Sequence, residues 1–222
     1  MCYTSIQNLY LEKGNVIVKA YERLLKYVVV RTPSDEESGK SPSSECQFKL
    51  AGLLKDEMTE LGLSDVKLDK HCYLYGRLPA TKGLEKLPSI GFIAHMDTVS
   101  DYCNGDINPV VTPDYDGGDL VLGNSGLILS PDTFPHLASL KGRTLITSDG
   151  TTILGADDKA GIAEILTMIE YITANNIEHP AICVAFTPDE EIGMGTEHFD
   201  VERFGADYAY TCLLYTSPSP RD

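Results

Sequence analysis

The sequence lacks several features that would place it in a membrane or outside the cell. No apolar stretch reaches the roughly 18–20 residues that a membrane-spanning helix requires. The first eight residues lack the basic region, apolar core and small-residue cleavage site of a secretion signal. The six cysteines are scattered and are never spaced as C-x-x-C, so we expect them to be mostly reduced, in a cytoplasmic protein.

Basic residues are also scarce. The 222-residue chain carries 18 lysines and arginines against 33 aspartates and glutamates, which gives a net charge of −15. Such a charge repels the phosphates of nucleic acids and of anionic membranes, so we expect neither as a partner. It also raises the local concentration of cations, which favours a divalent-metal site, although a solvated acidic surface explains most of the charge.

What the sequence does contain is an alternation of helical and extended patterns. Its length and its 42% hydrophobic content suffice for one large domain or two small ones. Strands that alternate with helices predict an α/β fold, with a mostly parallel or mixed sheet and helices on both faces. The predicted helices are Val18–Val30, Glu45–Leu61 and Lys159–Asn175; the predicted strands lie in Val66–Leu78, Ser89–Asp97, Gly142–Ser148, Ala181–Thr187 and Asp207–Thr211; Arg31–Ser44 and Ser100–Leu140 are predicted to be irregular.

One predicted strand ends in side chains that suit a catalytic or metal site. Ser89–Asp97 reads Ser-Ile-Gly-Phe-Ile-Ala-His-Met-Asp, an apolar run that closes on His-x-Asp. Residues two apart in a strand point to the same face, so His95 and Asp97 lie together. They lie at the carboxyl end of the strand, where open α/β sheets place their sites. The pattern alone is weak evidence, because it occurs by chance and such an aspartate is often only a turn residue.

Two later segments also place carboxylates directly after an apolar run. They are Leu154–Gly161 (Leu-Gly-Ala-Asp-Asp-Lys-Ala-Gly) and Phe186–Gly193 (Phe-Thr-Pro-Asp-Glu-Glu-Ile-Gly). Taken singly, each is most often the start of a helix, where acidic residues meet the positive end of the dipole. Their joint occurrence with the His-x-Asp strand favours one shared site.

The residue types in these segments fit a two-metal hydrolytic site. Zinc binds imidazole nitrogen and carboxylate oxygen, and paired ions share a bridging carboxylate. His95 supplies the imidazole, and either Asp157 or Asp158 can supply the bridge. Of Glu190 and Glu191, one can bind metal while the other accepts a proton from water.

The three motifs together closely resemble those of the co-catalytic zinc exopeptidases, and among them the tripeptide aminopeptidases. The similarity runs nearly unbroken from about residue 18 to residue 211. It implies the α/β catalytic domain of these enzymes and two zinc ions. It also implies release of the N-terminal residue of a tripeptide by a metal-activated hydroxide, and a cytoplasmic enzyme whose full-length form can be a homodimer. The similarity includes Gly117–Asp119, Leu129–Pro131, Thr144–Gly150 and Ala209–Thr211.

The resemblance also implies a role for each residue of the site. His95 would bind one zinc ion, and Asp97 would orient its ring. Asp157 would bridge the two ions, and Glu191 would bind the second. Glu190 would be the general base. The family gives no ligand role to the neighbouring aspartate of the Asp-Asp pair or to the nearby His198.

The resemblance breaks off after Thr211. There the family continues Val-Asp-Gly-Gly, and that aspartate is a ligand, whereas this chain has Leu213 at the position. The distal histidine ligand and the inserted lid and dimerisation domain are also missing, so we expect this chain itself to be inactive or nearly so. We interpret 18–211 as a partial catalytic domain, 212–222 as a non-native tail derived from a sequencing adapter, and 1–17 as a mis-annotated extension.

Other functions remain open at this point. A dipeptidase, a carboxypeptidase or an N-acyl amino-acid deacylase of the same family would share the metal motifs. A non-catalytic peptide-binding module could retain the fold. Zinc is favoured by the ligand types, and cobalt or manganese would suit similar sites.

Overall fold

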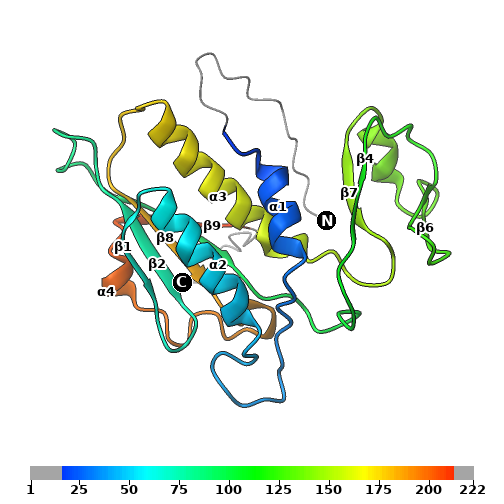
Figure 1. Cartoon of the computed structure of the whole chain (residues 1–222), viewed down its shortest axis with the longest axis horizontal. Helices are drawn as coiled ribbons and strands as arrows, with labels where there is room; N and C mark the ends of the chain where they lie inside the picture. The colour runs from blue at the N-terminus through cyan, green and yellow to red at the C-terminus, as the bar shows by residue number, and fades with distance from the viewer. Residues whose placement is uncertain (1–16, 213–222) are drawn as a thin grey trace, which may run out of the picture.

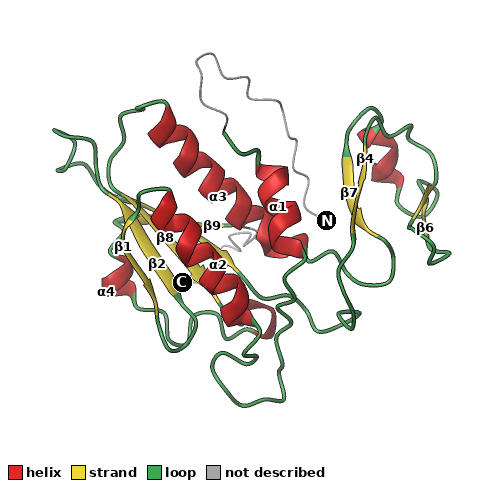
Figure 2. Ribbon diagram, viewed as in Figure 1, coloured by secondary structure: helices red, strands yellow, loops and turns green. Residues whose placement is uncertain are grey.

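The computed structural model describes residues 17–212 and centres them on one five-stranded sheet (Figures 1 and 2). β3 is parallel to both of its neighbours, β8 and β9, whereas β2 runs antiparallel to β1 and β8. The sheet is therefore mixed, as the predicted fold class allows. Its strands, in spatial order, are β1 (Ser64–Leu68), β2 (Leu74–Leu78), β8 (Ile182–Thr187), β3 (Ile90–His95) and β9 (Tyr208–Thr211).

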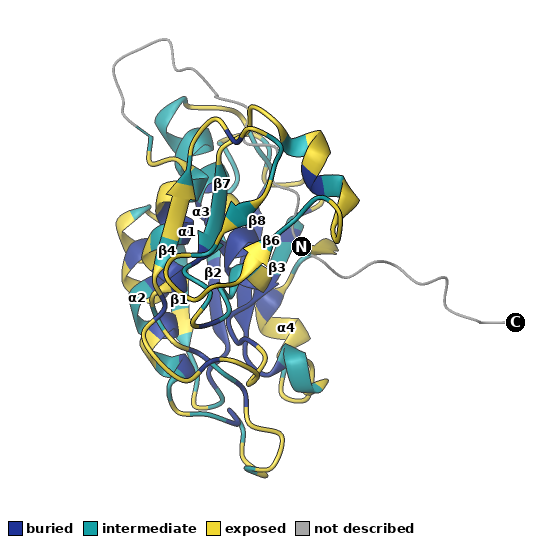
Figure 3. Ribbon diagram, turned by 90° about the vertical axis from the view of Figure 1, so that its right-hand side faces the viewer, coloured by how far each residue is buried: buried dark blue, intermediate teal, exposed yellow. Residues whose placement is uncertain are grey.

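Helices cover both faces of this sheet, unequally (Figure 1). The side chains of β8 alternate between two apolar clusters because successive strand residues point to opposite faces. Val184 and Phe186 join the larger cluster, which contains residues of α1, α2 and α3, and Cys183 and Ala185 join the smaller one with Phe204 of α4. All of β8 is buried, as expected for a strand whose residues are apolar up to the last one, Thr187 (Figure 3). The helices are α1 (Ala20–Val28), α2 (Gln47–Glu60), α3 (Ala156–Ala174) and α4 (Val201–Phe204).

A buried ionic network ties the three helices of the larger layer together. The Arg23 side chain of α1 is 3% exposed and lies 2.8 Å from carboxylate oxygens of both Glu57 on α2 and Glu170 on α3. Lys26 adds a second cation 2.9 Å from Glu57. Burial acts to raise the pKa of Glu57, but the hydrogen bonds from Lys26 and Arg23 outweigh it and lower that pKa. The charge of Glu57 therefore helps to hold the helix layer on the sheet.

The segment between β3 and α3 departs from the expectation. Ser100–Leu140 was predicted to be irregular, but it holds short strands and a 3-10 helix, and it extends away from the main sheet (Figure 1). Its apolar runs are only two residues long within each strand and lie among glycine and aspartate, so the sequence pattern of a strand is too short to detect. β7 (Leu145–Ser148), predicted as a strand, pairs with β4 in a separate two-stranded sheet. The other elements are β4 (Pro109–Thr112), β5 (Leu120–Val121), β6 (Ile128–Leu129) and η1 (Pro135–Leu140).

The remaining predicted helices and strands of the described chain are present. α3 is longer than predicted because its count includes Asp157 and Asp158, whose backbone angles are not helical. Among residues 17–212, no helix has the length and apolar content to cross a membrane. The interpretations of 1–17 and 212–222, and of Leu213 as a lost ligand, concern residues that lie almost wholly outside the described range.

Candidate metal centre

The ends of two neighbouring parallel strands position the site. His95, the last residue of β3, is in register with Thr187, the last residue of β8. The chain after Thr187 turns at once into a short 3-10 helix, η2 (Glu190–Ile192), and α3 begins beside the same sheet edge. Parallel strands deliver their carboxyl ends to one edge, so the three motifs converge there although they lie far apart in sequence.

Three of the predicted site residues form a compact set of potential ligands. One ligand atom from each of His95, Asp157 and Glu191 lies within 4.8 Å of the other two. This is the only group of three or more such side chains with this spacing in the described part of the chain. One nitrogen and two oxygen donors match the donor types of a catalytic zinc site.

His95 is held with both ring nitrogens engaged. Its side chain is 6% exposed; Nδ1 faces Asp97, 3.1 Å from the backbone oxygen and 3.4 Å from Oδ1. Nε2 lies 2.9 Å from Oδ1 of Asp157 and 3.7 Å from Oε2 of Glu190. Burial acts to lower the pKa of His95, but hydrogen bonds to Asp157 and Asp97 outweigh it and raise the pKa to about 10. Carboxylates that favour positive charge at Nε2 would equally favour a divalent cation there.

Asp97 is fully buried and links the two strand ends. Oδ1 accepts a hydrogen bond from the backbone N–H of Glu190 at 2.9 Å, and Oδ2 accepts one from the N–H of Glu191 at 3.1 Å. The same carboxylate thus faces His95 at the end of β3 and fixes the backbone of the two glutamates of η2, which follows β8. The resemblance implied only the contact with the histidine.

The Asp157–Asp158 pair separates into two different environments. The Asp157 side chain is 62% exposed, and the hydrogen bond from His95 lowers its pKa. Asp158 is fully buried, lies outside the ligand group, and accepts a hydrogen bond from the N–H of Gly161 at 3.1 Å. Burial raises the pKa of Asp158 to about 7. A Cβ at Gly161 would collide with the Asp158 carboxylate, so glycine leaves the space that this side chain occupies.

The two glutamates also differ in environment. Glu191 belongs to the ligand group, and burial raises its pKa. The Glu190 side chain is 38% exposed and lies beside His95 without joining the group. His198 does not belong to the group, and its ring stacks on that of His71 with 3.9 Å between centroids.

Several residues that support this site were not predicted from the sequence. Lys159, in the first turn of α3, is fully buried, and its Nζ donates to the backbone oxygen of Val30 at 2.6 Å. Burial lowers its pKa to about 8. Asp189, Ser43 and Gln47 form a second buried cluster that leads into η2. A sequence signal existed for Gln47, because it is one of two polar residues, with Glu57, on the mainly apolar buried face of α2.

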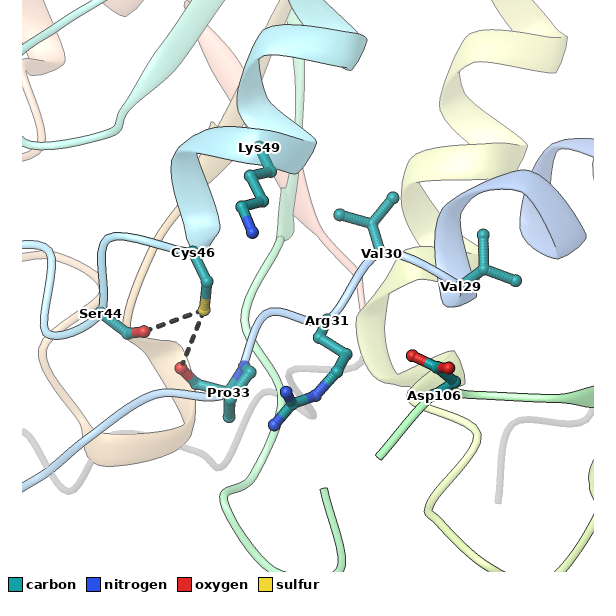
Figure 4. A pocket seen from close by; sticks show the side chains of 8 residues that line it. All are labelled: Val29, Val30, Arg31, Pro33, Ser44, Cys46, Lys49 and Asp106. Atoms are coloured by element: carbon teal, nitrogen blue, oxygen red, sulfur yellow. Dashed lines mark hydrogen bonds between the residues drawn. The ribbon is translucent and has the colours of Figure 1, made fainter. Parts of the chain in front are cut away.

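A separate cavity of about 530 Å³ lies between the start of α2 and the end of α1 (Figure 4). Arg31 and Lys49 line it together with Asp106, so charges of both signs face it. The Cys46 thiol on its wall lies 2.9 Å from the Ser44 hydroxyl and 3.8 Å from the backbone oxygen of Pro33. None of the ligand group lines this cavity, which is therefore distinct from the metal centre.

Comparison with known proteins identifies close relatives in sequence. The chain is 52% identical over 193 residues to peptidase T of Alkaliphilus oremlandii and 54% identical over 192 residues to peptidase T of Desulfitobacterium hafniense. Each alignment covers 86% of this chain but only 47% and 46% of the relative. No family model matches the chain.

Solved structures give the same relationship. The aminopeptidase PepT of Bacillus cereus superposes with a TM-score of 0.60 at 28% identity, and a tripeptidase of Staphylococcus aureus with 0.59 at 27%. Both matches cover 86% of this chain and 42% of the other. An aminoacylhistidine dipeptidase of Vibrio alginolyticus shares the fold at 22% identity and a TM-score of 0.56. The predicted resemblance is therefore confirmed: the chain is similar over 86% of its length to the peptidase T proteins, and it spans slightly less than half of theirs.

Proposed function

We propose that this chain is a partial catalytic domain, over 18–211, of a cytoplasmic zinc aminopeptidase that releases the N-terminal residue of tripeptides. The observation that carries the proposal is the convergence of His95, Asp157 and Glu191 at the ends of adjacent parallel strands. About 50% identity to peptidase T proteins supports the same reaction class.

The donor set fits zinc, and it suggests where two ions would bind. Nε2 of His95 and the carboxylate of Glu191 would each hold one ion, with Asp157 between them. When bound, zinc would lower the pKa of a water molecule and polarise the peptide carbonyl. Two exposed or half-exposed carboxylates leave the site open to solvent on one side.

The protein groups around these ligands have separable tasks. Asp97 faces Nδ1 of His95, which leaves Nε2 for the metal and fixes the orientation of the ring. Glu190 is held through its backbone beside that ring, and its half-exposed carboxylate would take a proton from the attacking water and return it to the departing amine. Taking up and returning this proton does not require Glu190 to bind metal.

The test is metal binding followed by hydrolysis. We expect the chain to bind Zn²⁺ or Co²⁺ in isothermal titration, and Glu191→Gln to weaken binding at least tenfold while Glu190→Gln leaves it within a few-fold. In the protein completed to the length of its relatives, we expect chelator-sensitive cleavage of tripeptides, no cleavage when the N-terminus is blocked, and at least a hundredfold loss of kcat in Glu190→Gln. Equal cleavage of blocked and free peptides would instead indicate a carboxypeptidase or a deacylase.

A further inference from the structure

The residue before the two glutamates, Asp189, is buried although it belongs to none of the ligand sets described above. Its side chain is 1% exposed, and its backbone has a positive φ of 57°. A non-glycine residue in this left-handed region is unusual and needs contacts that hold it there. The buried side chain and the backbone conformation of Asp189 must therefore be held in place by its contacts.

The contacts of Asp189 come from a distant part of the chain. Oδ2 accepts a hydrogen bond from the backbone N–H of Ser43 at 2.8 Å, and Oδ1 accepts one from the Ser43 hydroxyl at 2.5 Å and one from Nε2 of Gln47 at 2.6 Å. Ser43 and Gln47 are themselves buried, 5% and 0% exposed. All three donors are neutral, so hydrogen bonding alone compensates the loss of water around this carboxylate.

We propose that Asp189 is a positioning residue for the metal centre: by binding Ser43 and Gln47, it fixes the turn that presents Glu190 and Glu191. This inference rests on the proposed function. η2 contains only three residues, and the backbone of Asp189 is its first flanking residue, so a shift of Asp189 moves both glutamates. Asp97 anchors the turn to β3, and Asp189 anchors it to the start of α2.

The arrangement also explains two features of the sequence that the fold alone leaves unexplained. Gln47 is a polar residue on the buried face of α2, where its neighbours Leu50 and Ala51 are apolar. The polar loop before it is tethered at Ser43, whose hydroxyl also accepts a hydrogen bond from the N–H of Asp35 at 2.9 Å. The loop and the first residue of α2 thus together supply the hydrogen bonds to the Asp189 carboxylate.

The experiment is a cobalt(II) titration of the whole chain, followed by the visible absorption of the bound ion, with zinc affinity from calorimetry. We expect Asp189→Ala and Gln47→Met each to weaken binding about tenfold or more and to alter the cobalt spectrum, because the ligand geometry relaxes. Asp189→Asn should stay within about threefold of the parent chain. Its amide oxygen can accept from the Ser43 N–H. Its nitrogen would replace the oxygen that faces Gln47 Nε2, so the Gln47 amide must turn over; Gln47 Oε1, which has no partner among the described residues, can then accept from that nitrogen.

Ser89→Ala is the matched control. It removes a buried hydroxyl with similar hydrogen bonds at the opposite end of β3, 2.8 Å from Asp207, so it should lower stability without changing metal affinity or the spectrum. If Ser89→Ala weakens binding as much as Gln47→Met, general destabilisation accounts for the effect and the inference is wrong. If Asp189→Ala does not fold, Gln47→Met and Ser43→Ala decide.

The outcomes separate this inference from the function on which it rests. Binding by the parent chain that Glu191→Gln abolishes, with Asp189→Ala and Gln47→Met unaffected, overturns only the positioning role. No binding by the parent chain overturns the metal centre, and the positioning role with it. Loss in Asp189→Ala together with recovery in Asp189→Asn supports the inference.

Discussion

Asp97 offers the sharpest test of how the two strand ends are coupled. The substitution Asp97→Asn keeps the size of the side chain and removes one acceptor. Asp97 is fully buried and accepts from the backbone N–H groups of both Glu190 and Glu191. After the substitution the amide oxygen can accept from one of them, and the amide nitrogen faces the other donor.

The structure sets the size of the effect. A buried N–H left without an acceptor costs about 1–3 kcal/mol, and relaxation of the short η2 turn favours the lower half of that range. The contact between Asp97 Oδ1 and Nδ1 of His95, 3.4 Å long, also weakens. Changes to groups that orient metal ligands typically reduce affinity about 10–100-fold. We therefore expect a modest loss of stability and a large loss of metal affinity.

Two measurements on the same samples check this expectation: urea unfolding without metal and zinc titration by calorimetry. Asp207→Asn is the control, because Asp207 likewise accepts from a backbone N–H, that of Ser89 at 2.7 Å, but at the other end of β3. Zinc affinity of Asp97→Asn within about twofold of the parent, or an equal loss in Asp207→Asn, would refute the reasoning.

Three further substitutions test the helix layer, the core and the exposed edge of the sheet. Glu57→Gln should destabilise the chain by about 2–4 kcal/mol at neutral pH, since it removes the anion that Arg23 and Lys26 share, whereas Glu60→Gln on the exposed face should change stability by less than about 0.5 kcal/mol. Because the folded-state pKa of Glu57 is lowered, its charge stabilises the fold above the ordinary glutamate pKa, and this stabilisation is lost as the pH falls through the lowered value. In urea unfolding between pH 7 and pH 3, the difference in stability between the parent chain and Glu57→Gln should therefore shrink. A constant difference would contradict this assignment. Leu166→Ala, at a fully buried position of α3, should cost about 2–5 kcal/mol in the same assay, and a loss below about 1 kcal/mol would contradict the packing described. An exposed strand edge can pair with another chain, so we expect β9, the edge strand that carries the 67% exposed Tyr208, to promote self-association. Tyr208→Lys should then lower light scattering and leave the unfolding midpoint unchanged, and equal scattering by the two proteins would contradict this expectation.

The sequence predicted those parts of the site that depend on the regular periodicity of a strand or a helix. The alternation of a strand placed His95 and Asp97 on one side, and the structure has Asp97 facing the His95 ring. Helix periodicity predicted the regular part of α3 from Lys159 onward. Residue types alone could not distinguish Asp157 from Asp158, because the first turn of α3 has non-helical backbone angles there and turns one carboxylate outward and buries the other.

The residues that hold the metal-centre turn in place could not be predicted in the same way, because their role depends on contacts between residues far apart in sequence. Asp189 and its donor Ser43 are 146 residues apart, and the residues between them include most of the sheet. Nothing in Pro-Asp-Glu-Glu shows which of its three acidic residues is buried. Likewise, β4 and β7 stabilise each other across more than thirty residues, so neither short apolar segment identifies its partner.

The η2 turn is too short to position its two glutamates without contacts from distant parts of the chain. Two backbone hydrogen bonds close this turn: the N–H of Gly193 donates to the oxygen of Glu190 at 2.8 Å, and the N–H of Met194 donates to the oxygen of Asp189 at 2.9 Å. A three-residue 3-10 helix has few other internal hydrogen bonds to hold its shape. A metal centre needs its ligands placed to within a fraction of an ångström. The precision at Glu191 must therefore come from Asp97, through the register of β3 with β8, and from Asp189, through the packing of α2 on the sheet. It follows that substitutions deep in α2 can change metal affinity without touching a ligand.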